Sequence, residues 1–81
     1  MEEKYFITIL QTKLDGTVNQ STAQRSTLAV CLAEYYRALA VAPTSEDYTS
    51  ITAMVYTNLG RMIENQCVES LVVTVPEDTE A

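Results

Sequence analysis

The chain has 81 residues, 47% of them hydrophobic and 20% charged, with a formal net charge of −6 at pH 7 and no histidine. This length predicts one compact domain, expected over residues 1–76, with an acidic disordered tail over residues 77–81. Five unclustered basic residues argue against binding of a nucleic-acid polymer, and the missing histidine excludes the common hydrolase mechanisms, so we predict a non-enzymatic protein.

The first segment predicts a β-hairpin. Residues 4–12 (KYFITILQT) are rich in aromatic and β-branched side chains on both alternating faces, which favours a central strand. The sequence Asp15-Gly16 predicts a type I turn with a glycine bulge, because glycine adopts positive φ without a Cβ clash. Residues 17–24 (TVNQSTAQ) are largely polar and predict an edge strand. The two faces of the first strand carry Phe6 and Leu10 on one side and Tyr5, Ile7 and Ile9 on the other.

A helix is predicted after this hairpin. Ser26 or Thr27 can cap it, since a hydroxyl oxygen accepts from the unpaired amides of the first turn, and Pro43 ends it. Apolar residues recur at steps of three and four and define one buried stripe: Leu28, Leu32, Tyr35, Leu39 and Ala42. Of the adjacent Tyr35 and Tyr36, one is expected to face inward and the other the flank or solvent. Glu34 and Arg37 are three residues apart and predict a surface ion pair.

Residues 44–67 allow two predictions. Apolar residues at helical spacing, from Tyr48 to Met62, permit a second helix. However, residues 49–57 (TSITAMVYT) favour a strand, and Asn58-Leu59-Gly60 would place two poor helix formers inside such a helix. We favour a second hairpin with the same glycine turn. Its returning strand is expected over residues 61–69, continuing through residues 71–75 with a bulge near Glu69 or as a short fifth strand.

These elements predict an α+β fold with an antiparallel sheet of about four strands, arranged as β-hairpin, α-helix, β-hairpin, and with one helix packed on one face. A single helix leaves the opposite face uncovered. That face would carry the apolar side chains of Phe6, Leu10, Met54 and Tyr56. We therefore predict these four residues as an interface and the protein as a homo-oligomer.

The remaining features predict little specific chemistry. Cys31 and Cys67 stand in no metal-binding or redox spacing and are interpreted as small buried hydrophobes, so no metal or cofactor is expected. No apolar run approaches the ~20 residues that span a bilayer, which predicts a cytoplasmic protein without membrane association. A small ligand would need basic and aromatic groups, for which the candidates are Arg25, Tyr36, Arg37 and Arg61.

The order of these features resembles a family of small phage and prophage proteins of gut Gram-positive bacteria. The likeness covers about residues 4–69: an opening strand like KYFITILQTKLDGT, a helix like LAEYYRALA and a strand-turn-strand like SITAMVYTNLGRMIENQCVE. It implies a hairpin-helix-hairpin domain in a bacterial host cell, acting by oligomerising and interfering with host defence, through binding of a host protein or sequestration of a nucleotide signal. The alternative is a virion or morphogenesis accessory protein without a ligand pocket.

Overall fold

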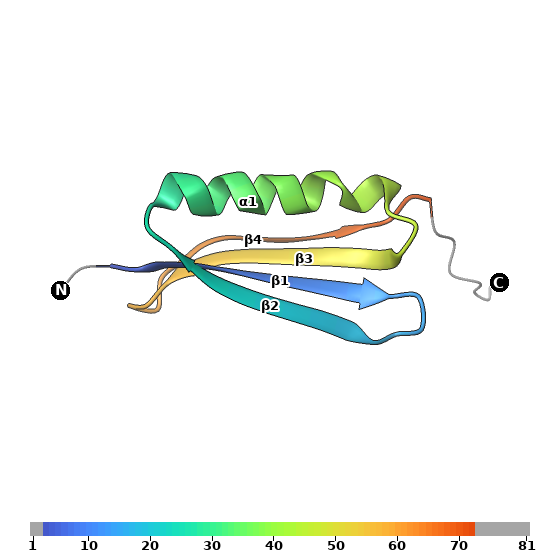
Figure 1. Cartoon of the computed structure of the whole chain (residues 1–81), viewed down its shortest axis with the longest axis horizontal. Helices are drawn as coiled ribbons and strands as arrows, with labels where there is room; N and C mark the ends of the chain where they lie inside the picture. The colour runs from blue at the N-terminus through green and yellow to red at the C-terminus, as the bar shows by residue number, and fades with distance from the viewer. Residues whose placement is uncertain (1–2, 73–81) are drawn as a thin grey trace.

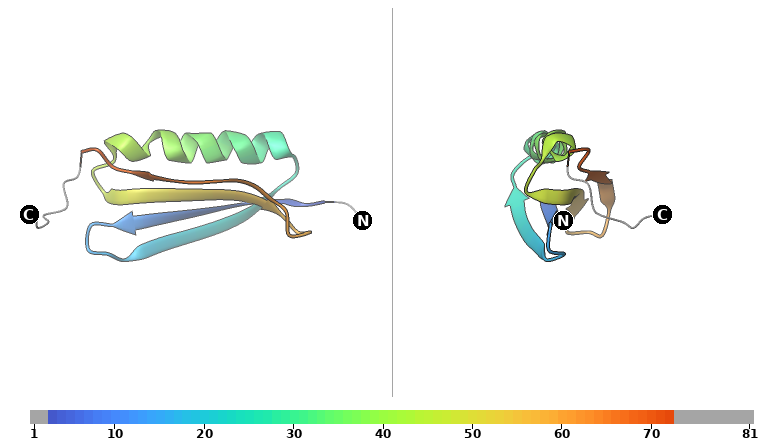
Figure 2. Two further views of the ribbon diagram at one scale, coloured as in Figure 1. Left: turned by 180° about the vertical axis from the view of Figure 1, so that it is seen from behind. Right: turned by 90° about the vertical axis from the view of Figure 1, so that its right-hand side faces the viewer.

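The computed structural model describes residues 3–72, which form one antiparallel sheet and one α-helix (Figure 1). The elements in chain order are β1 (Tyr5–Lys13), β2 (Val18–Arg25), α1 (Leu28–Ala40), the 3-10 helix η1 (Ala42–Thr44), β3 (Tyr48–Thr57) and β4 (Met62–Glu69). The four strands are ordered β2-β1-β3-β4, and α1 lies across one side of the sheet (Figure 2). The predicted α+β fold, the central first strand and the polar edge strand are confirmed.

Both hairpins turn at a glycine with positive φ, 92° at Gly16 and 86° at Gly60. In the first turn the Gly16 N–H donates to the Lys13 carbonyl (3.0 Å) and the Lys13 N–H donates to the Thr17 carbonyl (2.7 Å). The second turn repeats this pattern between Thr57, Gly60 and Arg61. These hydrogen bonds are those of a type I turn followed by a glycine bulge. Residues 48–69 therefore form the favoured hairpin, and the alternative of a second helix is wrong.

The core lies between α1 and the two central strands. Its buried residues come from β1 and β3 on one side and from α1 and η1 on the other: Ile7, Ile51, Ala53, Val55, Cys31, Tyr35, Leu39 and Ala42. The two adjacent tyrosines separate as predicted, with Tyr35 2% exposed and Tyr36 58% exposed. The Thr27 hydroxyl caps α1 by accepting from the Val30 N–H at 3.2 Å. Val41 is the C-terminal cap, and Pro43 lies just beyond it in η1.

Two predictions about side chains are wrong. Cys67 is exposed, because it lies on the edge strand β4 and alternates with Val68, which packs against the core, so it points away from the helix. Glu34 forms its ion pair with Arg25 at the end of β2, because that guanidinium reaches the helix from the neighbouring sheet edge. Arg37 contributes only a longer-range attraction, which lowers the pKa of the Glu34 carboxyl.

The second hairpin also differs in detail from the prediction. The register of β3 and β4 shifts between Val55 and Tyr56, which places the bulge next to the turn rather than near Glu69. Strand β4 ends at Glu69, and the Leu71 N–H donates instead to the Pro43 carbonyl at 2.9 Å. The predicted extension over residues 73–75, the domain boundary at residue 76 and the acidic tail lie outside the described residues. Over residues 3–72, no helix is both long and apolar enough to cross a membrane.

Candidate functional site

The face of the sheet turned away from α1 is the candidate site, and we call it the open face. Because side chains alternate along a strand, the even-numbered positions of β1, β2 and β3 point to it. These positions are Phe6, Thr8, Leu10 and Thr12, then Val18, Gln20, Thr22 and Gln24, then Ser50, Thr52, Met54 and Tyr56. Opposite β3, strand β4 adds Met62, Asn65, Cys67 and Glu69. The structure thus brings the four predicted interface residues Phe6, Leu10, Met54 and Tyr56 onto one surface.

An aromatic pair forms one end of the open face. Phe6 and Tyr56 are cross-strand neighbours, and their rings stack with centroids 5.9 Å apart and an interplanar angle of 14°. Both side chains are half-buried by each other and by the strands around them. Such a pair adds a stacking contribution to the area it buries. The aromatic surface is therefore pre-organised, and covering it would cost little additional ordering of these two rings.

A row of hydroxyl groups crosses the same face from β2 to β3. Thr8 Oγ1 lies 2.9 Å from Thr22 Oγ1 and 2.7 Å from the Tyr56 hydroxyl oxygen, and Thr8 is only 4% exposed. The hydroxyl of Thr8 therefore already has two hydrogen-bond partners. An apolar surface placed over it would not leave this buried group unpaired, which is the usual cost of covering a polar atom.

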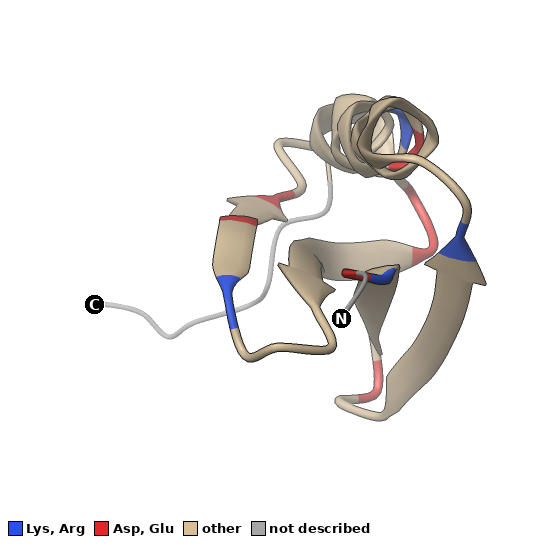
Figure 3. Ribbon diagram, turned by 90° about the vertical axis from the view of Figure 1, so that its left-hand side faces the viewer, with Lys and Arg blue, Asp and Glu red and all other residues tan. Residues whose placement is uncertain are grey.

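Charged side chains are nearly absent from the open face. Among its strand positions only Glu69, at the outer margin, carries a charge, although the whole chain has a net charge of −6. Figure 3 shows charged residues mainly at strand ends, in turns and on the helix. Four of them form ion pairs there, Arg25 with Glu34 and Arg61 with Glu3. In each pair the guanidinium lowers the pKa of the carboxyl group through its hydrogen bond.

The four residues predicted to bind a ligand do not converge in the structure. Arg25 ends the edge strand β2, whereas Arg61 lies in the turn between β3 and β4, across the width of the sheet. Both guanidinium groups are held by carboxylates. Tyr36 and Arg37 are exposed on α1, on the side of the helix away from the core. These four residues are therefore not arranged around a common ligand.

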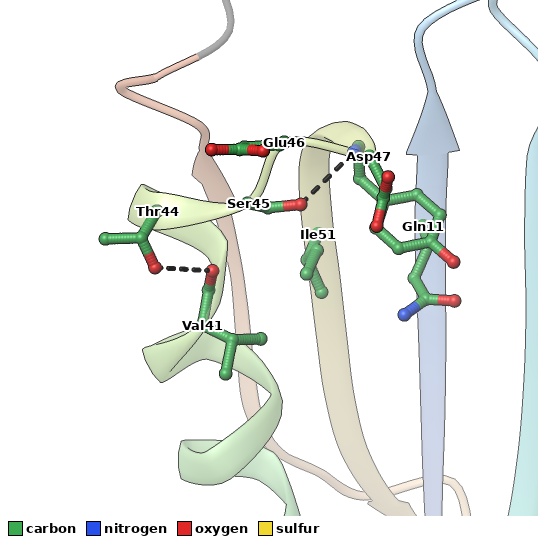
Figure 4. A pocket seen from close by; sticks show the side chains of 8 residues that line it. Gln11, Val41, Thr44, Ser45, Glu46, Asp47 and Ile51 are labelled. Atoms are coloured by element: carbon green, nitrogen blue, oxygen red, sulfur yellow. Dashed lines mark hydrogen bonds between the residues drawn. The ribbon is translucent and has the colours of Figure 1, made fainter.

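A pocket that the sequence did not reveal lies where α1 ends (Figure 4). It has a volume of about 420 Å³ and is lined by Gln11, Val41, Thr44, Ser45, Glu46, Asp47, Tyr48 and Ile51. The segment after the helix forms its wall, fixed by a hydrogen bond from the Tyr48 N–H to Ser45 Oγ at 3.1 Å. In sequence the only signal was Glu46-Asp47, which resembles any solvated loop. Over residues 3–72, no cluster of side chains is suited to hold a metal ion.

Comparison with family models, with curated proteins and with solved structures finds no match to this chain. The resemblance to small phage and prophage proteins therefore stays a prediction.

Proposed function

We propose that this chain is a non-enzymatic interaction protein that works as a homo-oligomer, its subunits joined through their open faces. The single observation that carries this proposal is a half-apolar, almost uncharged sheet face on a chain whose net charge is −6. The cores of protein interfaces are depleted in charged residues and enriched in aromatic residues and methionine. The open face, with Phe6, Tyr56 and Met54, has this composition.

The size of the open face is sufficient for a small specific interface. Four strands spaced about 4.8 Å apart, each with about eight residues rising about 3.4 Å, give a footprint of about 500 Å² for each subunit. Two such faces would bury about 1,000 Å² together, which is near the lower limit for a specific interface. Sheets stacked in this way lie about 10 Å apart, with the two helices on the outside.

A second copy fits this face better than an unrelated charged partner. Two acidic subunits repel each other, and the repulsion is least when the surfaces that meet carry almost no charge. Pairing through the open face would leave both Arg25–Glu34 pairs and both Arg61–Glu3 pairs in solvent. The hydroxyl row centred on Thr8 is already satisfied internally, so covering this part of the face leaves no hydroxyl group of the row unpaired.

Sedimentation velocity tests this proposal with two variants that each add one positive charge. Met54→Lys places a cation in the middle of the open face, whereas Val30→Lys places one on the exposed surface of α1. We expect Met54→Lys to lower the mass of the oligomer and Val30→Lys to leave it unchanged, with both variants folded by circular dichroism. A wild-type protein that stays monomeric at several hundred micromolar, or equal effects of the two variants, would contradict the proposal.

The molecule that such an oligomer would bind follows from the resemblance alone: a host protein or a nucleotide signal in the bacterial cytoplasm. Within the proposal, Arg25, Arg37 and Arg61 lie outside the face-to-face interface, so a nucleotide would contact them on the outer surface of the oligomer. Calorimetric titration of the wild-type oligomer with cyclic and linear nucleotides is the direct measurement. Heat that is lost in Arg37→Gln would support a nucleotide ligand. No heat with any nucleotide would leave a protein as the partner.

A further inference from the structure

The outer edge of β2 carries unpaired backbone groups. The hydrogen bond from the Lys13 N–H to the Thr17 carbonyl fixes which residues of the hairpin bond across it. Pairing alternates along an antiparallel ladder, so Ser21 and the other odd-numbered residues of β2 bond to β1. The N–H and C=O groups of the even-numbered residues point outward: Val18, Gln20, Thr22 and Gln24. Within residues 3–72 one of these groups has a partner, the Gln24 carbonyl, which accepts from Arg25 Nη1 at 3.1 Å.

This edge lacks the features by which proteins prevent strands from pairing with other chains. Such features are bulges, prolines and charged side chains on the edge strand. Strand β2 pairs with β1 without a register shift, and residues 18–24 contain neither a proline nor a charge. The opposite edge, β4, has a register shift and two carboxylates, Glu64 and Glu69. The two edges of one sheet therefore differ in their protection, and β2 is open to an added strand.

We propose that β2 pairs antiparallel with β2 of a second copy, about a two-fold axis that passes through Ser21. The choice of a second copy rests on the proposed self-association, but the surface is separate from the open face. In this register Gln20 pairs with Thr22 of the second copy, and Val18 pairs with Gln24. Every outward backbone group of residues 18–24 then finds a partner, and registers shifted by two residues satisfy fewer of them.

Charge favours the antiparallel arrangement. Arg25 at the end of β2 comes to lie opposite Thr17 of the second copy, next to the turn that contains Asp15. The Asp15 carboxylate there accepts hydrogen bonds from the N–H and hydroxyl of Thr17, which lower its pKa and keep it ionised. At both ends of the pair Arg25, which also holds Glu34, therefore approaches an acidic turn rather than a second arginine. A parallel arrangement would instead place Arg25 beside Arg25 and Asp15 beside Asp15.

Edge pairing extends the surface used in the proposed function. Two four-stranded sheets would join into one sheet of eight strands, with both helices on the same side and both open faces on the other. The two-fold axis of the edge pair is perpendicular to the sheet, and that of a face pair lies between the sheets. Two perpendicular two-fold axes that intersect close into a tetramer rather than an open fibre.

Disulfide trapping tests the edge pair and its register. In a Cys67→Ser background, which removes the exposed native thiol, Ser21→Cys places two thiols across the proposed axis. Their Cα atoms would be about 4.5–5.5 Å apart, within the range that a disulfide bridges. Asn19→Cys is the matched control on the same face of β2, because its two copies would be about 13 Å apart.

We expect mild oxidation to cross-link Ser21→Cys at least about tenfold faster than Asn19→Cys, since only the first pair is within disulfide range. Equal rates, or no cross-linking of Ser21→Cys, would overturn the proposal. Faster cross-linking of Gln20→Cys or Thr22→Cys would overturn the register, because it would place the axis at those residues.

A second variant separates this surface from the open face. Gln20→Pro removes an outward N–H and none of the bonds to β1, so it is tolerated on an edge strand. We expect it to halve the mass of the wild-type assembly, and we expect cross-linking through Ser21→Cys to persist in a Met54→Lys background. An unchanged mass in Gln20→Pro would refute edge pairing and leave the open-face proposal standing. Loss of mass in Gln20→Pro but not in Met54→Lys would refute the open-face proposal alone.

Discussion

Replacing Gly60 by alanine should lower the stability of the protein if this residue lies in a hairpin turn and raise it if the residue lies in a helix. In the structure Gly60 has a φ of 86°, and a Cβ added there meets no atom within 4 Å. The cost is therefore one of backbone conformation, about 1–2 kcal/mol for an L-residue in the left-handed region. Alanine also restricts the unfolded chain, which returns about 0.4–1 kcal/mol. The net expectation is a destabilisation of about 1 kcal/mol.

Urea denaturation followed by circular dichroism measures this change in the free energy of unfolding. Gly60→Asn is the matched control, because asparagine enters the left-handed region more readily than alanine and should cost less. If residues 45–67 were helical, alanine would instead stabilise the chain by about 0.8–1 kcal/mol relative to glycine. A stabilised Gly60→Ala variant, or an asparagine variant less stable than the alanine variant, would refute the hairpin and with it the open face.

Three further results are expected. Thr27→Ala should destabilise the protein by about 1 kcal/mol in urea denaturation, because the helix loses its capping hydroxyl. Arg25 lowers the pKa of the Glu34 carboxyl below its ordinary 4.5. This ion pair therefore stabilises the fold above pH 4.5, and the stabilisation is lost as the pH falls through the lowered pKa. In Arg25→Gln, an NMR titration should show a higher pKa for Glu34. In dilute protein, where the proposed oligomer dissociates, an aromatic disulfide reagent should label Cys67 rapidly and Cys31, which is 0% exposed, only after unfolding. At high protein concentration the labelling of Cys67 should slow, because Cys67 lies on the open face.

The architecture could be predicted because its signals are local. Asp15-Gly16 and Asn58-Leu59-Gly60 favour turns through the backbone freedom of glycine, and at the second turn the β-branched residues before it favour a hairpin over a helix. Alternation along β1 then separates Phe6 and Leu10 from Ile7 without any knowledge of the neighbouring strands. Once both hairpins are known, side-chain parity alone places the four predicted interface residues on one face.

What the sequence could not give depends on the strand order. Cys67 and Val68 look alike as apolar residues, and their exposure differs because β4 is an edge strand and one of its faces turns away from the helix. The ion-pair partner of Glu34 depends on which strand lies beside the start of the helix. That strand is β2, and its last residue, Arg25, reaches Glu34. The strand order also separates the predicted ligand residues Arg25 and Arg61, since they lie at opposite edges of the sheet.

The widths of the helix and the sheet explain why part of the sheet is not covered by the helix. A helix with its side chains is about 10–12 Å across, whereas four strands span about 19 Å. One helix can therefore bury the two central strands, and the fully buried sheet residues Ile7, Ile51, Ala53 and Val55 all come from β1 and β3. Strands β2 and β4 contribute only half-buried residues to the same core.

The two edge strands, β2 and β4, also differ in how readily each would accept an added strand. The bulge and carboxylates of β4 hinder an added strand, whereas β2 presents a regular edge that is uncharged over residues 18–24. Within residues 3–72, the open face and the β2 edge are therefore the two surfaces on which the proposed self-association depends.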